Sequence, residues 1–185
     1  MKERKETISI VMANVLAVAI LAGGALLLGV PFGVVWKGAV TVSPIGALLT
    51  CVMCLVGIVV HELLHGVTWA CFAKRKWHSV HFGVMWKMLT PYCHCDESLR
   101  KSAYMLGAFM PCLVLGVVPT VAAFFTGRVM LLIYGVIFIS AAAGDLMVMW
   151  RLRKEKSNVM VQDHPSEAGY LVYEEDESDI VTNKE

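Results

Sequence analysis

Long apolar stretches dominate the chain, and their lengths predict its main elements. Residues 8–30 hold no charged side chain over 23 positions, and about 20 apolar residues suffice for a helix to cross the hydrocarbon core of a bilayer. Three more apolar runs cover about residues 45–73, 102–125 and 129–150. The pattern predicts four membrane-spanning helices. We expect Pro31 and Gly33 to end the first, and Pro111 and Pro119 to kink the third.

A different periodicity appears between the second and third runs. Residues 79–88 alternate between two kinds of side chain, and the apolar set is Val80, Phe82, Val84, Trp86 and Met88. A period of two is typical of an amphipathic strand, and Pro91 fits a turn or an edge position after it. We expect a β-hairpin or a bent strand at the cytoplasmic membrane surface. The alternative is an interfacial loop with Trp77 and Trp86 among the lipid headgroups.

The sequence turns polar beyond Lys156. Residues 161–173 hold two short β-prone pieces around a turn, and the acidic residues 174–185 are typical of a disordered tail. We therefore divide the chain into a four-helix transmembrane domain, residues 1–156, and a cytoplasmic C-terminal tail, residues 157–185. The expected fold class is an all-α membrane protein with a short amphipathic strand or hairpin between helices two and three.

Composition supports a membrane protein. Hydrophobic residues make up 57% of the 185 residues, charged residues make up 17%, and the mean hydropathy is +0.65. Soluble domains carry about 25% charged residues, so the excess apolar surface must face a bilayer. The net charge is +1 and no basic stretch is interleaved with aromatic residues, which excludes a nucleic-acid surface.

The basic residues near the helix ends predict the orientation. If the N-terminus is cytoplasmic, the cytoplasmic segments hold thirteen lysines and arginines, and the opposite side holds only Lys37 and Arg128. Basic residues favour the cytoplasmic side. We therefore predict a multi-pass protein of the cell membrane with both termini in the cytoplasm. The first apolar run exceeds the roughly 7–15 residues of a signal-peptide core, so we expect an uncleaved anchor.

Two acidic residues, Glu62 and Asp145, lie inside the strongly apolar runs, where an ionisable side chain is costly and marks a functional candidate. Glu62 belongs to the sequence His61-Glu62-Leu63-Leu64-His65, an HExxH motif. Residues four apart share one face of a helix, so both imidazoles can bind one metal ion while Glu62 serves as general base. This composition would produce the motif by chance in about 1% of such chains. The alternative is a hydrogen-bonded polar patch between helices.

A catalytic zinc needs a third protein ligand and an open position. The candidates are Asp145, His78, His81, Cys93, His94, Cys95, Asp96 and Asp163. Asp145 lies six residues before Arg151. His65 lies nine residues before Lys74, so at about 1.5 Å per residue both side chains sit at a matching depth. Ala141 to Ala143 form a small-residue face that favours close helix approach, and we favour Asp145.

The cysteines offer two further hypotheses. On a strand, alternate residues point to the same face, so Cys93 and Cys95 could share a structural metal with His94 pointing away. The alternative is lone surface thiols and a solvated histidine. Cys51 and Cys54 have the spacing of a redox motif, but they lie in a membrane run without a βαβ context. We expect them to behave as small hydrophobic side chains.

These motifs together resemble those of a family of small membrane proteins described as putative zincin peptidases. The resemblance rests on HELLHG late in helix two, the alternating segment, the proline-containing third helix, AGD in the fourth helix and DHPxxxG beyond it. It covers most of residues 45–172. More remotely, the chain is similar to the site-2 protease class of intramembrane metalloproteases, although Asp145 is followed by Leu146 where that class has glycine. The resemblance implies a zinc-dependent peptidase.

We therefore expect a membrane-embedded zinc-dependent endopeptidase. The ligands of Zn2+ would be His61, His65 and Asp145, and Glu62 would be the catalytic base. The substrates would be transmembrane or juxtamembrane segments of membrane proteins or peptides, held by β-addition to the strand at residues 80–88. Two alternatives stay open, a non-proteolytic metal-binding scaffold and a metal permease. The scarcity of other polar groups in the helices argues against the permease.

Overall fold

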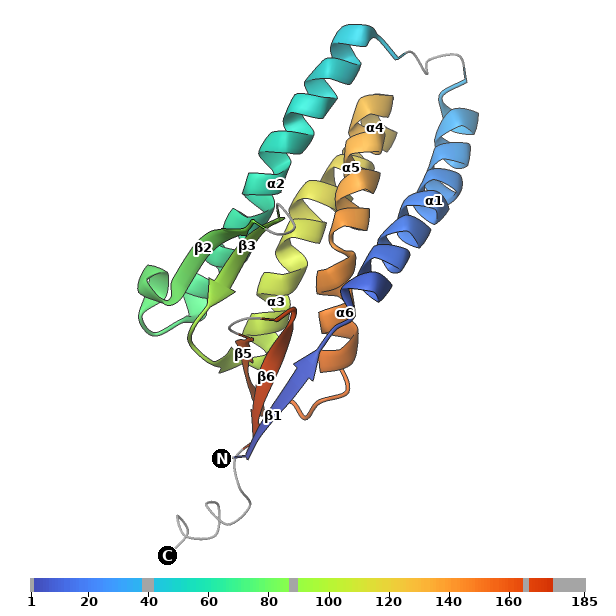
Figure 1. Ribbon diagram of the computed structural model, residues 1–185. Coiled ribbons are helices and arrows are strands. Elements are labelled where there is room, and N and C mark those ends of the chain that lie inside the picture. Colours follow the sequence, from blue (N-terminus) through green and yellow to red (C-terminus); the bar gives the residue numbers. More distant parts are fainter. Residues whose placement is uncertain (1, 38–41, 87–89, 165–166, 175–185) are drawn as a thin grey trace, which may run out of the picture.

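Long helices form the body of the molecule, and two small sheets lie at one end of it (Figure 1). The computed structural model describes residues 2–37, 42–86, 90–164 and 167–174. Its α-helices are α1 (Ile10–Val35), α2 (Pro44–Phe72), α3 (Lys101–Pro111), α4 (Val118–Thr126), α5 (Val129–Ala141) and α6 (Ala143–Leu152). A short 3-10 helix, η1 (Lys76–Ser79), follows α2, and a π-helical segment, η2 (Cys112–Val117), joins α3 to α4.

Three helical spans are long and apolar enough to cross a membrane, namely α1, α2 and the continuous span Lys101–Thr126. Helices α5 and α6 are bent by 49° at their junction and make a fourth span if they are counted as one. The first two helices begin at serines whose hydroxyls accept a backbone N–H bond from the first turn, Ser9 from Met12 and Ser43 from Gly46. Such N-caps satisfy donors that a helix start leaves free.

The first helix is longer than predicted. It continues through Pro31 and Gly33 to Val35, where the Trp36 N–H bonds to the Phe32 carbonyl. The prediction that Pro31 and Gly33 end it is therefore wrong. A proline removes only one helical hydrogen bond. In apolar surroundings the chain keeps the remaining bonds, because unsatisfied backbone groups are costly there.

The predicted hairpin is confirmed. Strands β2 (Val80–Met85) and β3 (Thr90–Cys95) pair antiparallel between the second and third spans. Pro91 lies opposite Val84 in this two-stranded sheet, which is an edge position that tolerates a residue without an N–H. The phenol ring of Tyr92 fills the space beside Gly83 on the neighbouring strand, where a Cβ would collide with it.

A second sheet corrects the all-α fold class, because the molecule is mostly helical but not entirely so. Its strands are β1 (Lys2–Thr7), β4 (Leu99–Arg100), β5 (Met160–Asp163) and β6 (Gly169–Glu174), in the spatial order β1-β6-β5-β4 with antiparallel pairing throughout. The two β-prone pieces near the C-terminus are thereby confirmed as β5 and β6. Strand β1 was missed because its charged sequence reads as the flank of a membrane helix.

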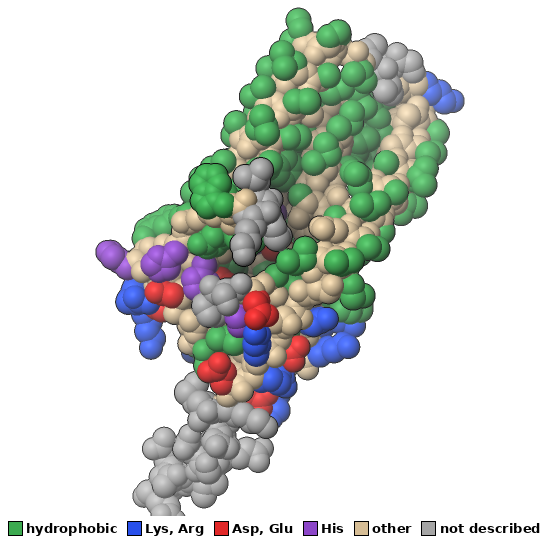
Figure 2. Space-filling model, in the orientation of Figure 1, with side chains coloured by type: hydrophobic (Ala, Val, Ile, Leu, Met, Phe, Trp, Pro, Cys, Tyr) green, Lys and Arg blue, Asp and Glu red, His purple; other side chains and the backbone are tan. Residues whose placement is uncertain are grey.

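The main core lies where the sheet meets the ends of the helices. Leu152 of α6, Val161 of β5 and Val172 of β6 are fully buried there with Trp69 and Tyr104. Hydrophobic side chains cover the helical part of the surface, whereas charged side chains gather around the sheet (Figure 2). The predicted disordered tail lies largely outside the described residues, which end at Glu174. The division of the chain at residue 156 stays a prediction.

Candidate metal centre

Helix α2 places His61 and His65 one turn apart on a face that is turned into the bundle. Their rings meet edge to face with 4.9 Å between the ring centroids. His65 is buried, and only 12% of the His61 side chain is exposed. Because α2 packs against α3 and α5, these two imidazoles are shielded from the surroundings of the helices.

Asp145 reaches the same point from the first turn of α6. Its Oδ2 lies 3.2 Å from Nε2 of His61, and its Oδ1 lies 3.5 Å from Nε2 of His65. A carboxylate is favourable at this place because the break between α5 and α6 creates a new helix N-terminus. One possible ligand atom from each of the three residues lies within 4.8 Å of the other two. Within the described parts of the chain, this is the group that could hold a metal ion.

The donor set fits zinc. Two imidazole nitrogens and one carboxylate are ligands that catalytic zinc sites use, with a fourth position left open. The Nδ1 of His65 donates to the carbonyl oxygen of Gly107 at 2.9 Å. This hydrogen bond places a ring proton on Nδ1 and leaves Nε2, which faces Asp145, as the nitrogen that can bind a metal, which is how metal-binding histidines are usually oriented. The Trp69 indole stacks on the His65 ring, with 5.1 Å between the ring centroids.

Glu62 lies beside the two histidines without joining their group. Its carboxylate accepts a hydrogen bond from the backbone N–H of Cys93 in β3, and β3 packs against α2. The hairpin therefore orients the carboxylate of the HExxH motif. A carboxylate next to a metal site but outside its ligand set is the usual position of a general base.

Space is open beside Asp145. The side chain of Asp145 is 26% exposed, and a Cβ added to Gly144 would meet nothing within 4 Å. Figure 2 shows a hollow in the surface between the hairpin and the helices.

The other candidates for the third ligand lie outside this group. His81 pairs with Asp96, with 3.2 Å between Nε2 and Oδ2. His94 lies 3.9 Å from a carboxylate oxygen of Asp163. His78 belongs to η1, beyond the end of α2. The structure therefore brings together the predicted set of His61, His65 and Asp145, whose role as ligands stays a prediction.

The cysteines do not form a second metal group among the described residues. Cys93 and Cys95 are free thiols. Burial raises the pKa of Cys95 to about 11 and raises the pKa of Cys93 further. Among the described residues, the group of side chains placed to hold a metal ion does not include either thiol. Cys51 and Cys54 are free as well and lie on α2.

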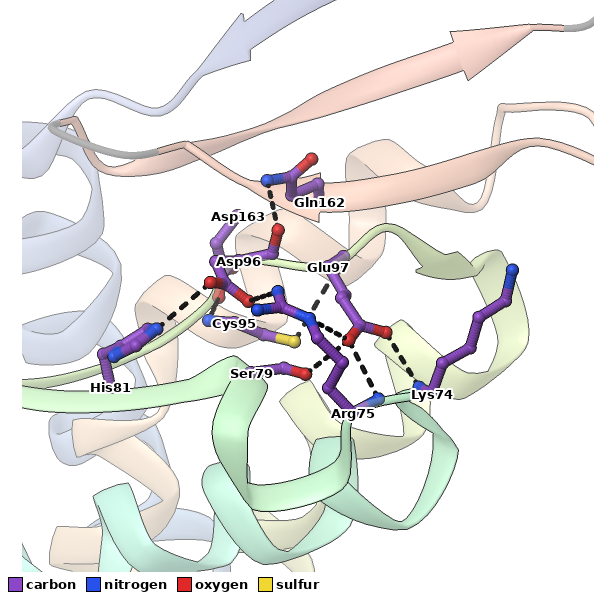
Figure 3. A network of polar contacts seen from close by, with 9 residues as sticks. All are labelled: Lys74, Arg75, Ser79, His81, Cys95, Asp96, Glu97, Gln162 and Asp163. Carbon is purple, nitrogen blue, oxygen red and sulfur yellow. Dashed lines mark hydrogen bonds and ion pairs between the residues drawn. The ribbon is translucent and has the colours of Figure 1, made fainter.

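A polar network ties the hairpin to the end of α2 (Figure 3). Glu97 accepts hydrogen bonds from the backbone N–H groups of Lys74 and Arg75, from the Arg75 guanidinium and from the Ser79 hydroxyl, at 2.6 to 2.9 Å. The Ser79 hydroxyl is the largest of the influences that lower the pKa of Glu97 to about 2. The carboxylate therefore stays charged across the physiological pH range and keeps these elements together.

Asp163, the last residue of β5, connects this strand to the elements around the site. It accepts hydrogen bonds from the Tyr104 hydroxyl of α3 and from the Cys95 backbone N–H at 2.9 Å. Tyr104 in turn stacks on Trp69, 5.3 Å between ring centroids. Asp163 thus holds together the elements next to the centre, whereas the sequence analysis included it among the candidates for the third metal ligand.

Several groups that shape the site escaped the sequence analysis. The Gly107 carbonyl and the Cys93 N–H are backbone atoms, which leave no signal in residue type. Trp69 did carry a signal, since it lies four residues after His65 and so shares its helix face.

The molecule combines apolar helices that are long enough to cross a membrane with a two-histidine, one-carboxylate candidate metal site. A family model described as "Putative zincin peptidase" matches residues 54–160. The chain belongs to this family. A search of curated proteins and a search of solved structures find no match.

Proposed function

We propose that this protein is a membrane-embedded zinc-dependent endopeptidase that hydrolyses transmembrane or juxtamembrane peptide bonds. The observation that carries the proposal is the convergence of His61, His65 and Asp145 from two different helices, with Glu62 beside them. Three charged or polar ligands at membrane depth are costly unless an ion or a partner satisfies them. A metal centre accounts for all three.

Each residue of the site has a separate role. His61, His65 and Asp145 would hold the ion, and zinc when bound would supply Lewis acidity and lower the pKa of water towards about 7. Glu62 takes the proton of the attacking water and passes it to the leaving amine. The Cys93 N–H fixes the Glu62 carboxylate for both steps, because it holds the side chain in one orientation.

The surroundings of the site favour an extended polypeptide as substrate. The Asp145 side chain is 26% exposed, and the surface is hollowed between the hairpin and the helices. In the described residues, β2 pairs only with β3, so its other edge is available for β-addition by an unwound substrate segment. The substrate would be a membrane protein or peptide in the lipid bilayer, and both chain termini would lie in the cytoplasm.

Metal removal tests the proposal. Purified protein is reconstituted in vesicles together with a single-span model peptide, and the products are identified by mass spectrometry. We expect a zinc chelator to stop cleavage and about one zinc ion per chain to restore it, as for other three-ligand catalytic sites.

The two alternatives give different results in the same vesicles. A metal-binding scaffold would bind zinc and leave the peptide intact at every zinc concentration. A permease would carry zinc to a fluorescent indicator trapped inside the vesicles. Either outcome without peptide cleavage contradicts the proposed function.

A further inference from the structure

The hydrogen bond between His65 and Gly107 uses a carbonyl inside a helix, and such a carbonyl accepts from another helix most readily when its own N–H partner is missing. In an α-helix, each carbonyl normally accepts from the N–H four residues further on. Gly107 lies inside α3, Lys101–Pro111, so its carbonyl should have such a partner. An explanation is needed for why it faces His65 of α2 instead.

The residue four positions after Gly107 is Pro111. Proline has no N–H, and its ring pushes against the carbonyl four residues before it. The next N–H along the chain, that of Cys112, bonds to the Phe109 carbonyl. The Gly107 carbonyl is therefore released by the helix that contains it, and it accepts from His65 Nδ1 at 2.9 Å.

The packing between α2 and α3 keeps these two groups opposite each other. A Cβ on Gly107 would overlap the Trp69 indole, so only glycine allows this close approach. The Trp69 Nε1 donates to the Tyr104 carbonyl at 3.2 Å, and the indole stacks on His65. The Pro111 ring itself is fully buried against the bundle.

We propose that Pro111 is a positioning residue of the metal centre. By leaving the Gly107 carbonyl without a helical partner, it provides the acceptor that fixes the proton of His65 on Nδ1 and directs Nε2 towards Asp145. This inference rests on the proposed function only in taking the ion as zinc. It assigns a role to one of two prolines in the third span, which makes the other a matched control.

Pro111→Ala and Pro119→Ala provide the test. Alanine restores a backbone N–H in both cases and is the best helix former, so we expect both variants to fold. Pro111→Ala makes the new N–H compete for the Gly107 carbonyl and lets that carbonyl tilt back towards the helix axis. We expect the dissociation constant for zinc to rise about tenfold. This is the low end of the effects seen when a metal-bound histidine loses its hydrogen-bond partner. We expect Pro119→Ala to bind zinc as the wild type does.

The protonation pattern of the ring gives a readout that needs no activity. In metal-free protein with 15N-labelled histidine, nuclear magnetic resonance should show the Nδ1 of His65 protonated and hydrogen-bonded, with the signal assigned by its loss in His65→Ala. In Pro111→Ala the hydrogen-bonded Nδ1–H signal should weaken and shift, and Pro119→Ala should match the wild type.

Two outcomes overturn the inference. One is that Pro111→Ala matches the wild type in zinc affinity and in the His65 signal. The other is that both proline variants weaken zinc binding equally, which would reflect the shape of the helix alone. If the wild type binds no zinc, the proposed function fails, and the comparison of the His65 Nδ1–H signals still decides the role of Pro111.

Discussion

Glu62→Gln should keep its zinc and lose at least about 10²-fold in kcat, the lower end of what a general base contributes. The glutamine side chain has the same size and still accepts from the Cys93 N–H, so the hairpin should stay in place. It cannot take a proton from water. The measurement is zinc content together with the rate of peptide cleavage in vesicles.

Glu167→Gln is the matched control for this change. Glu167 is an exposed acid that pairs with Lys5 at 2.7 Å, far along the chain from the site. The Glu167→Gln variant should cleave the peptide at the wild-type rate. If Glu62→Gln also cleaves at that rate, then Glu62 is not the base and the proposed mechanism is wrong.

Asp145→Ala should lose both zinc and activity, because it removes one of three ligands outright. Loss of a partner outside the ligand set already costs about 10- to 100-fold in affinity or activity, so we expect the dissociation constant for zinc to rise by at least about 100-fold. Asp145→Asn should be intermediate, since a neutral amide oxygen is a weaker donor to the ion. Zinc titration of the metal-free variants measures both effects.

The control for Asp145 is another aspartate in an ion pair. Asp96 pairs with Arg75 at 2.6 Å on the surface, and Asp96→Ala should bind zinc as the wild type does. The contradicting result would be full zinc content in Asp145→Ala with loss of zinc in His94→Ala or Asp163→Ala. The third ligand would then lie outside α6.

The sequence predicted the parts of this molecule that depend on local pattern. Uninterrupted apolar runs indicated the helices, the period of two indicated the hairpin, and the HExxH spacing indicated the shared face of His61 and His65. The convergence of Asp145 with these histidines followed from a simple measure of depth along two helices. These features could be predicted because each depends on one continuous stretch of sequence, or on distances counted from a boundary that two helices share.

The features that were missed depend on contacts between distant segments. Strand β1 pairs with β6, which brings Lys5 opposite Leu171 across most of the chain length. The charged sequence of β1 has no strand pattern of its own. The segment is extended because it pairs with β6, which lies at the other end of the chain. The continuation of α1 past Pro31 was missed as well, because a proline removes only one helical hydrogen bond and the bonds on either side of it remain.

The groups that orient the site depend on geometry that residue types do not record. The acceptor for His65 is a backbone carbonyl released by a proline four residues away, and the donor to Glu62 is a backbone N–H of a neighbouring strand. Prolines in the third span were predicted to kink it. The π-helical segment begins directly after Pro111, whereas Pro119 lies in the first turn of α4, where proline is well tolerated.

The central claim is that two histidines of α2 and one aspartate of α6 hold the catalytic metal. X-ray absorption at the zinc edge of wild-type protein loaded with about one zinc per chain tests it most directly. The account predicts imidazole nitrogen and carboxylate oxygen at about 2.0–2.2 Å from zinc and no sulfur. A sulfur neighbour at about 2.3 Å would place the metal on the cysteines of the hairpin and contradict the account.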